Sequence, residues 1–284
     1  MKKNYLKTII LFFFMLVNAF LNAQDFQGVA TYKTSRKMDL KIDSTAVSNG
    51  MNADMQEKLN AMLQKQFQKE YTLTFNASES MYKQEGKLAA PAPGNDGMSI
   101  MLVGNGESTI LYKNTKEKRY ANKEDLMGKV FLIQDSLQNT AWKLGSETKF
   151  IGQYQCYKAT RTKEIEKITA MSFNDDTKEP EVTKETITIT AWYTLEIPVN
   201  NGPGMYWGLP GLILEVNDGS ETIVCSKIVI NPKDKITISE PTNGKKVNQA
   251  TFDEIMEKKS KEMMERYRGN RRNSDDGYRI EIRG

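Results

Sequence analysis

The sequence predicts a mainly β protein of the α+β class, built on one large curved antiparallel sheet. Three observations support this: roughly ten short runs have strand character, short turns join them, and two substantial helices interrupt the series. A regular alternation of strands and helices, which would indicate a parallel sheet, is not present. A sheet of this length must curl, split into a sandwich or close into a half-barrel. We expect one helix to cover its apolar face and a second helix to follow near the C-terminus.

The N-terminal residues 1–23 predict a signal peptide that is removed on export. Three lysines precede an apolar stretch at 9–17, and small residues follow at 19–23. The apolar stretch is short for a membrane span. We expect cleavage after Ala23, or alternatively after Ala19, and a soluble protein in the periplasm or outside the cell. An uncleaved N-terminal anchor is the other interpretation.

The charge of the chain gives no support to nucleic-acid binding. The 40 Lys and Arg residues face 36 Asp and Glu residues, and loss of the three signal lysines leaves a net charge near +1. We divide the remainder into an antiparallel β domain at 24–250 and a C-terminal helix with a basic and polar tail at 251–284. The basic cluster of this tail precedes Asp275 and Asp276, which favours a solvated segment. It comprises Arg266, Arg268, Arg271 and Arg272.

The chain contains no histidine, which excludes several familiar kinds of site. Ser-His-Asp and Cys-His nucleophiles and His-ligated metal sites all require that residue. We predict no catalytic residues, no cofactor and no metal. The two cysteines, Cys156 and Cys225, could form one disulfide in an exported protein, closing a loop of about 70 residues at a gain on the order of 4 kcal/mol. Two separate buried thiols are an equal alternative.

The elements follow in chain order. A first strand at 28–35 alternates apolar and polar residues. A helix at 52–69 follows, capped by Asn52 and carrying an apolar stripe that we expect to pack on the sheet. The Pro- and Gly-rich stretch at 89–99 predicts a loop. The other predicted strands are 71–75, 80–83, 109–113, 118–121, 130–134, a strand opening at 142, a strand at 149–160 bent at Gly152, 186–193, 212–216 and 222–230.

A final helix is predicted from Thr251 to about Tyr267. Thr251 and Glu254 form the pattern of a capping box. Two Ser-x-x-Lys pairs, beginning at Ser80 and Ser146, resemble a Ser/Lys nucleophile. Both fall in strand-like segments, where residues three apart point to opposite faces, so we reject a catalytic role for them.

The stretch GLPGLILEV at 208–216 joins a turn directly to an apolar strand. Pro210 and Gly211 suit a type II turn in which the glycine has positive φ. Leu212, Leu214 and Val216 should then project to one side of the strand, with Ile213 and Glu215 on the other. Because its flanks are apolar, we expect the turn, or Trp207 beside it, to pack on the sheet core.

This stretch lies within a longer segment, AWYTLEIPVNNGPGMYWGLPGLILE at 191–215, which resembles the signature of the GLPGLI family, also called Porph_ging. A second matching block runs from Trp142 to Thr160. The family consists of exported proteins of Bacteroidetes-type bacteria without an established activity. The resemblance implies a cell-envelope protein, possessing no catalytic residues to carry over, that acts near outer-membrane receptor systems.

Aromatic residues of these two blocks are the candidate binding residues. They could line an apolar cavity suited to a lipid, porphyrin-like or peptide ligand. Alternatively, they form the core of a β protein. With the turn residues, the candidates are Trp142, Trp192, Tyr206, Trp207, Gly208, Leu209, Pro210 and Gly211.

Two functions remain open on the sequence alone. The favoured hypothesis is a non-enzymatic, exported cell-envelope protein that binds an apolar small molecule or an outer-membrane protein. The alternative is a histidine-independent hydrolase that uses carboxylates or a hydroxyl nucleophile. We favour the first because the chain has no histidine and shows no nucleophile motif in its place.

Overall fold

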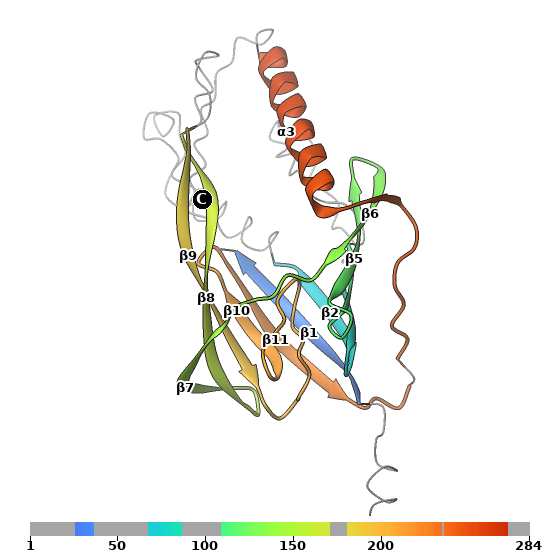
Figure 1. Ribbon diagram of the computed structural model, residues 1–284, viewed down its shortest axis with the longest axis vertical. Coiled ribbons are helices and arrows are strands. Elements are labelled where there is room, and N and C mark those ends of the chain that lie inside the picture. Colours follow the sequence, from blue (N-terminus) through green and yellow to red (C-terminus); the bar gives the residue numbers. More distant parts are fainter. Residues whose placement is uncertain (1–25, 37–67, 87–108, 171–180, 235, 272–284) are drawn as a thin grey trace, which may run out of the picture.

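The computed structural model describes residues 26–36, 68–86, 109–170, 181–234 and 236–271 of the 284-residue chain. The predicted signal peptide, the helix predicted at 52–69 except for its last two residues, and the loop at 89–99 lie outside these residues. The described part is mainly β, as the sequence predicts, with one 12-stranded sheet and a long helix (Figure 1). No helical segment in these ranges has the length and apolarity that crossing a bilayer requires.

The strands lie in the order β12-β6-β5-β4-β3-β2-β1-β11-β10-β9-β8-β7. Neighbours pair antiparallel, except that β12 pairs parallel to β6, so the sheet is mixed and not closed. The elements are β1 (Gln27–Arg36), β2 (Glu70–Asn76), β3 (Glu79–Gln84), β4 (Ile110–Asn114), β5 (Arg119–Leu126), β6 (Lys129–Ser136), β7 (Lys143–Ile151), β8 (Tyr154–Ala170), β9 (Glu181–Thr194), β10 (Leu212–Asn217), β11 (Glu221–Ile230), β12 (Lys245–Val247) and α3 (Gln249–Arg271).

The predicted strand at 149–160 is wrong as a single element. The chain turns at Gly152, whose φ is +59°, and residues on its two sides pair with each other as β7 and β8. Glycine adopts this backbone conformation without the steric cost that a Cβ would add. The predicted bend is therefore a hairpin turn.

A short connection bridges two distant parts of the strand order. β6 lies beside one end of that order and β7 at the other, yet residues 137–142 join them. A chain spans at most about 3.6 Å per residue, so the sheet must curl to bring the two strands this close. Figure 1 shows this segment, which we call the strap, crossing in front of the central strands.

The main core packs on one face of the curled sheet, so residues that point to that face are buried at every second position of a strand. In β1, every second residue from Gly28 to Thr34 is buried, including Ala30 and Tyr32. This burial pattern confirms the half-buried strand predicted there. The neighbouring strand β2 adds Leu73 and Phe75 to the same cluster.

Helix α3 attaches to this core near β6. Phe252 is buried, and its ring centroid lies 5.4 Å from that of Phe131. The predicted capping role of Thr251 is wrong: the side-chain oxygen of Asn248 accepts a hydrogen bond from the Thr251 backbone N–H at 2.9 Å. Asn248 is therefore the N-cap, and Thr251 lies within the first turn.

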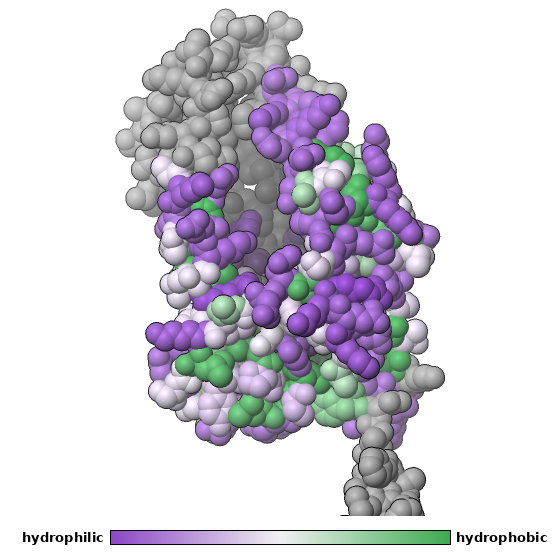
Figure 2. All heavy atoms as spheres, in the orientation of Figure 1, coloured by the Kyte–Doolittle hydropathy of each residue, from purple (hydrophilic) through white to green (hydrophobic). Residues whose placement is uncertain are grey.

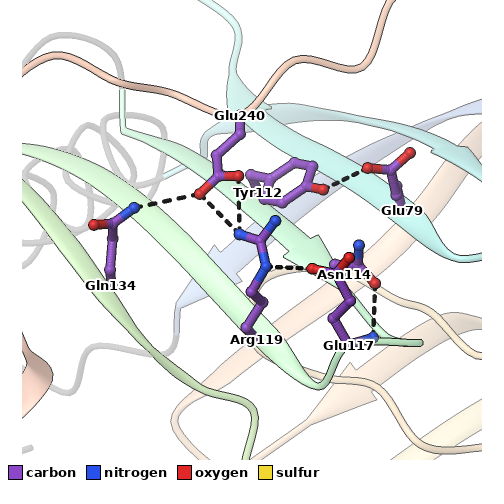
Figure 3. Close-up of polar contacts among 7 residues, drawn as sticks. All are labelled: Glu79, Tyr112, Asn114, Glu117, Arg119, Gln134 and Glu240. Carbon is purple, nitrogen blue, oxygen red and sulfur yellow. Dashed lines mark hydrogen bonds and ion pairs between the residues drawn. The ribbon is translucent and has the colours of Figure 1, made fainter.

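A polar network holds the segment that follows β11 against the face of the sheet opposite the main core (Figure 3). Arg119 donates to both carboxylate oxygens of Glu240 at 2.8 Å and also pairs with Glu117. Its guanidinium carbon lies 5.6 Å from the centroid of the Tyr112 ring. Ile238 packs nearby on a small cluster that includes Tyr112.

Candidate functional site

The residues between β9 and β10, 195–211, form a loop that we call the motif loop because it contains most of the GLPGLI signature. Ile197, Val199 and Trp207 are buried in the main core cluster. Leu209 is buried in a second cluster with residues of β8, β9 and β10. The prediction that Trp207 or the turn packs on the core is confirmed.

A buried lysine of β4 holds this loop from within the sheet. The Lys113 ammonium donates to the carbonyl oxygens of Gly202 at 2.8 Å, Gly204 at 2.7 Å and Tyr206 at 3.3 Å. The side chain has no solvent exposure, and burial lowers the pKa of Lys113 to about 7. The three donor hydrogens of its protonated form match three backbone acceptors, so Lys113 organises the loop.

Two further buried groups fix the loop and the strand that follows it. The hydroxyl of Ser80 donates to the side-chain oxygen of Asn201 at 3.1 Å. The phenol of Tyr32 donates to the carbonyl of Ile213 at 2.7 Å. Burial raises the pKa of Tyr32 well above its ordinary value, so the phenol stays protonated and remains a donor.

The strap also binds the motif loop through hydrogen bonds. Thr140 donates its hydroxyl to the carbonyl of Trp207 at 3.0 Å, and the indole N–H of Trp142 donates to the same oxygen at 2.8 Å. The loop is thereby held between the strap and side chains of β3 and β4. Many polar side chains around the signature therefore form hydrogen bonds that hold the motif loop in place.

The predicted type II turn with positive φ at Gly211 is wrong. Gly204 and Gly208 have positive φ, at +53° and +97°, but Gly211 is not among the positive-φ glycines. A Cβ placed on Gly211 would lie 1.9 Å from the carbonyl oxygen of Thr194. Close packing of two backbone segments, instead of an unusual dihedral angle, requires glycine there. Pro210 is exposed beside it.

The alternation predicted along β10 is broken by a bulge. The pairing with β9 shifts between Ile213 and Glu215, which leaves Leu214 as the extra residue. Leu212 and Leu214 pack in the main cluster, whereas Ile213 and Val216 pack in the second. The prediction that Val216 shares the environment of Leu212 and Leu214 is therefore wrong.

The predicted aromatic residues occupy different environments. Trp207 is buried, and the Lys149 ammonium lies 4.5 Å from the centroid of the Trp192 ring. Trp142 and Tyr206 are partly buried against the second cluster, where both contact the guanidinium of Arg161. A pocket of about 280 Å³ lies elsewhere, lined by residues of β1 and β11 and by residues 68–70. These contacts favour the core interpretation of the aromatics.

Cys156 and Cys225 are both buried in the main cluster as free thiols. Each donates to a backbone carbonyl, of Tyr154 and Lys227 respectively. Burial raises the pKa of Cys156 to about 11 and that of Cys225 to about 12. The thiols are thus protonated at neutral pH in this form, and the disulfide remains a hypothesis for measurement.

The rejected Ser/Lys pairs behave as their strand positions predict. Ser80 is buried against Asn201, whereas Lys83 is exposed. Ser146 is exposed, and Lys149 pairs with Glu215 at 2.7 Å. Neither pair brings a lysine amine to its serine hydroxyl.

Residues 142–215 match the Porph_ging family. The family is described as a protein of unknown function, and the match confirms the resemblance over these residues. The Porph_ging segment begins at the last residue of the strap and includes β7, the described parts of β8 and β9, and the motif loop.

Two solved structures are similar to a larger part of the chain. They are PNGF-II in its C2 and P21 crystal forms, at 14% and 15% sequence identity and TM-scores of 0.45 and 0.46. The alignments cover 81% and 80% of this chain. The chain spans about a third of the length of those structures, 32% in each case. No curated protein matches it.

Proposed function

We propose that this protein is a non-enzymatic, exported cell-envelope protein that binds a partner protein through its edge strand β7. The observation that carries the proposal is an exposed edge strand with two large apolar side chains, Leu144 and Phe150, at the end of the sheet. β7 is the last strand of the order and pairs with β8 on its inner side. The outer backbone of such a strand can accept an additional strand.

The apolar side chains of β7 support binding there. Leu144 and Phe150 are 58% and 71% exposed. They pair with Ala159 and Gln155, which are four residues apart on β8, so both side chains lie on the same face. Figure 2 shows apolar residues along the lower end of the molecule in this view, which includes the region of β7, whereas α3 is mostly hydrophilic.

A bulge narrows the part of β7 that a partner strand could use. The register with β8 shifts between Leu144 and Thr148, which interrupts the regular edge. Residues 148–151 lie beyond this bulge and contain Phe150. The proposed strand addition therefore uses residues 148–151.

A protein partner is better supported than an apolar small molecule. The aromatics proposed to line a ligand cavity are engaged in packing, in hydrogen bonds and with cations. Polar groups near the signature, including Lys113 and Ser80, are bonded to the motif loop itself. These engagements suit a rigid binding scaffold. No specific observation supports the alternative function as a hydrolase.

The binding test uses a photo-crosslinking residue at position 150 of the full chain in its native cells. We expect a covalent adduct with one envelope protein, and loss of the complex in a Phe150→Lys variant, since a charge at an edge strand opposes strand addition. Met127→Lys is the matched control, because Met127 is 54% exposed at the turn between β5 and β6. Equal recovery of the partner with both variants, or no adduct, would contradict the proposal.

Export is tested separately by cell fractionation and N-terminal sequencing. The envelope location is supported by the predicted signal peptide and by the family resemblance. We expect the protein outside the cytoplasm with Gln24 as its first residue. Recovery of an intact N-terminus in the cytoplasm would contradict export without bearing on the β7 contact.

A further inference from the structure

An arginine of β8 is held by two aromatic side chains of the Porph_ging segment. The guanidinium carbon of Arg161 lies 4.9 Å from the ring centroid of Trp142 and 5.3 Å from that of Tyr206. The three residues come from the strap, β8 and the motif loop, which the fold brings together. The indole of Trp142 is held by its bond to the Trp207 carbonyl, and the backbone of Tyr206 is held by Lys113. The guanidinium therefore lies between two anchored segments.

Among the described residues, this guanidinium has no hydrogen-bond acceptor. The Nε atom of Arg161 is buried and has no hydrogen-bond partner in the described part of the chain. No ion pair connects Arg161 to a carboxylate of the described residues. A buried donor left without an acceptor costs about 1–3 kcal/mol, and such groups in native proteins call for an explanation.

Arg119 shows how the same chain satisfies a comparable arginine. It also lies over an aromatic ring, that of Tyr112, but its donors reach Glu117 and Glu240 (Figure 3). Those carboxylates raise the pKa of Arg119, whereas burial lowers the pKa of Arg161. The difference between the two sites is an acidic partner. An external anion would supply it at Arg161.

We infer that Arg161, held by Trp142 and Tyr206, binds the carboxylate or phosphate group of a ligand. Guanidinium presents a planar set of N–H donors that matches both of these oxyanions and stacks on aromatic rings. The two aromatic contacts use no acceptor atom, so the N–H donors of the guanidinium remain for the anion. The inference does not rest on the proposed docking through β7, and each can fail without the other.

The test follows the side-chain Nε–H resonance of Arg161 by NMR in the full mature chain. Inorganic phosphate and acetate are titrated separately at constant ionic strength. We expect a saturable shift of the Arg161 resonance with at least one anion, while the Arg119 resonance stays in place. A shift with phosphate alone identifies a phosphate ligand, a shift with acetate alone a carboxylate ligand, and shifts with both an oxyanion in general. No saturable shift with either, or parallel shifts at both arginines, would overturn the inference.

A matched pair of variants provides the second measurement. Arg161→Lys keeps the charge but loses the planar fork, so we expect anion affinity, measured by calorimetry, to fall about tenfold or more. Arg119→Lys should leave that affinity unchanged. Circular dichroism establishes that each variant is folded. Equal affinity in folded Arg161→Lys and wild type would overturn the inference, and the resonance of wild-type Arg161 decides the matter should the variant not fold.

Discussion

The α-carbon of Gly211 faces the carbonyl group of Thr194 so closely that a Cβ would lie 1.9 Å from its oxygen. Thr194 ends β9, and Gly211 immediately precedes β10, so this contact joins the two ends of the motif loop. Real non-bonded atoms never approach so closely, and neither backbone segment can move without disturbing the pairing of Leu212 with Thr194. The second glycine of the GLPG sequence is therefore required by packing.

Replacing Gly211 with alanine should destabilise the protein by at least about 2 kcal/mol, because the new methyl group overlaps a fixed backbone carbonyl. Chemical denaturation of the purified protein measures the free energy of unfolding. Gly86→Ala is the control, since a Cβ at Gly86 has nothing within 4 Å. Equal stability of the two variants would show that the close approach is not present in solution.

Lys113 is expected to contribute to stability through the motif loop. Lys113→Met removes the donor shared by three carbonyls, and we expect a net loss of about 2 kcal/mol because buried acceptors are left unpaired. Lys83→Met, at an exposed position of β3, should change stability by less than about 0.5 kcal/mol. Limited proteolysis within 195–211 should also accelerate in Lys113→Met. An unchanged unfolding midpoint in that variant would contradict the structural role.

The pH dependence of stability follows from the lowered pKa of Lys113. In the folded protein this amine titrates at about 7, and in the unfolded chain near 10.5. Between these values the unfolded state binds more protons, so stability should rise as pH increases above 7. The buried cysteines lower stability as pH rises above about 9. Their pKa values in the folded protein are raised from 9.0, so the unfolded chain releases these protons first.

The comparison is therefore made between pH 7 and 8.5. The free energy of unfolding of the wild type, relative to that of Lys113→Met, should increase over this range. A flat difference between the two proteins would mean that the ammonium keeps its proton throughout, and the predicted titration would be wrong.

The sequence predicts the features of the fold that depend on neighbouring residues. The alternation in β1 is visible because one face of that strand is buried along its length. The hairpin between β10 and β11 is visible from its turn residues at 217–220. Such signals require no knowledge of which strands meet across the sheet.

Features that depend on distant strands were not predictable. The Leu214 bulge and the function of Gly211 arise from pairing with β9, and the partners of Lys113 are about 90 residues away along the chain. One signal for Lys113 does exist. Alternation places it on the same face of β4 as buried Leu111, and a lysine at such a position indicates a buried polar contact. Arg161 carries no comparable sequence signal.

The cysteines should resist labelling in the folded protein if both are free. Thiolate is the reactive form, and burial keeps both thiols protonated at neutral pH. We expect a maleimide to modify neither cysteine in buffer and both in denaturant without reductant, as counted by intact mass. Labelling in denaturant that requires a reductant would establish the Cys156–Cys225 disulfide.

Mutations can distinguish the two candidate N-caps of α3, Asn248 and Thr251. Asn248→Ala removes the acceptor of the Thr251 N–H and should cost about 1 kcal/mol of stability. Thr251→Ala leaves that bond intact, since the backbone N–H is the donor, and should be close to neutral at an exposed position. Thermal unfolding of the two variants measures the difference. The helix also anchors Phe252 to Phe131, so the loss should appear in the global transition as well as in helix content. A larger effect at Thr251 than at Asn248 would restore the capping box predicted from the sequence.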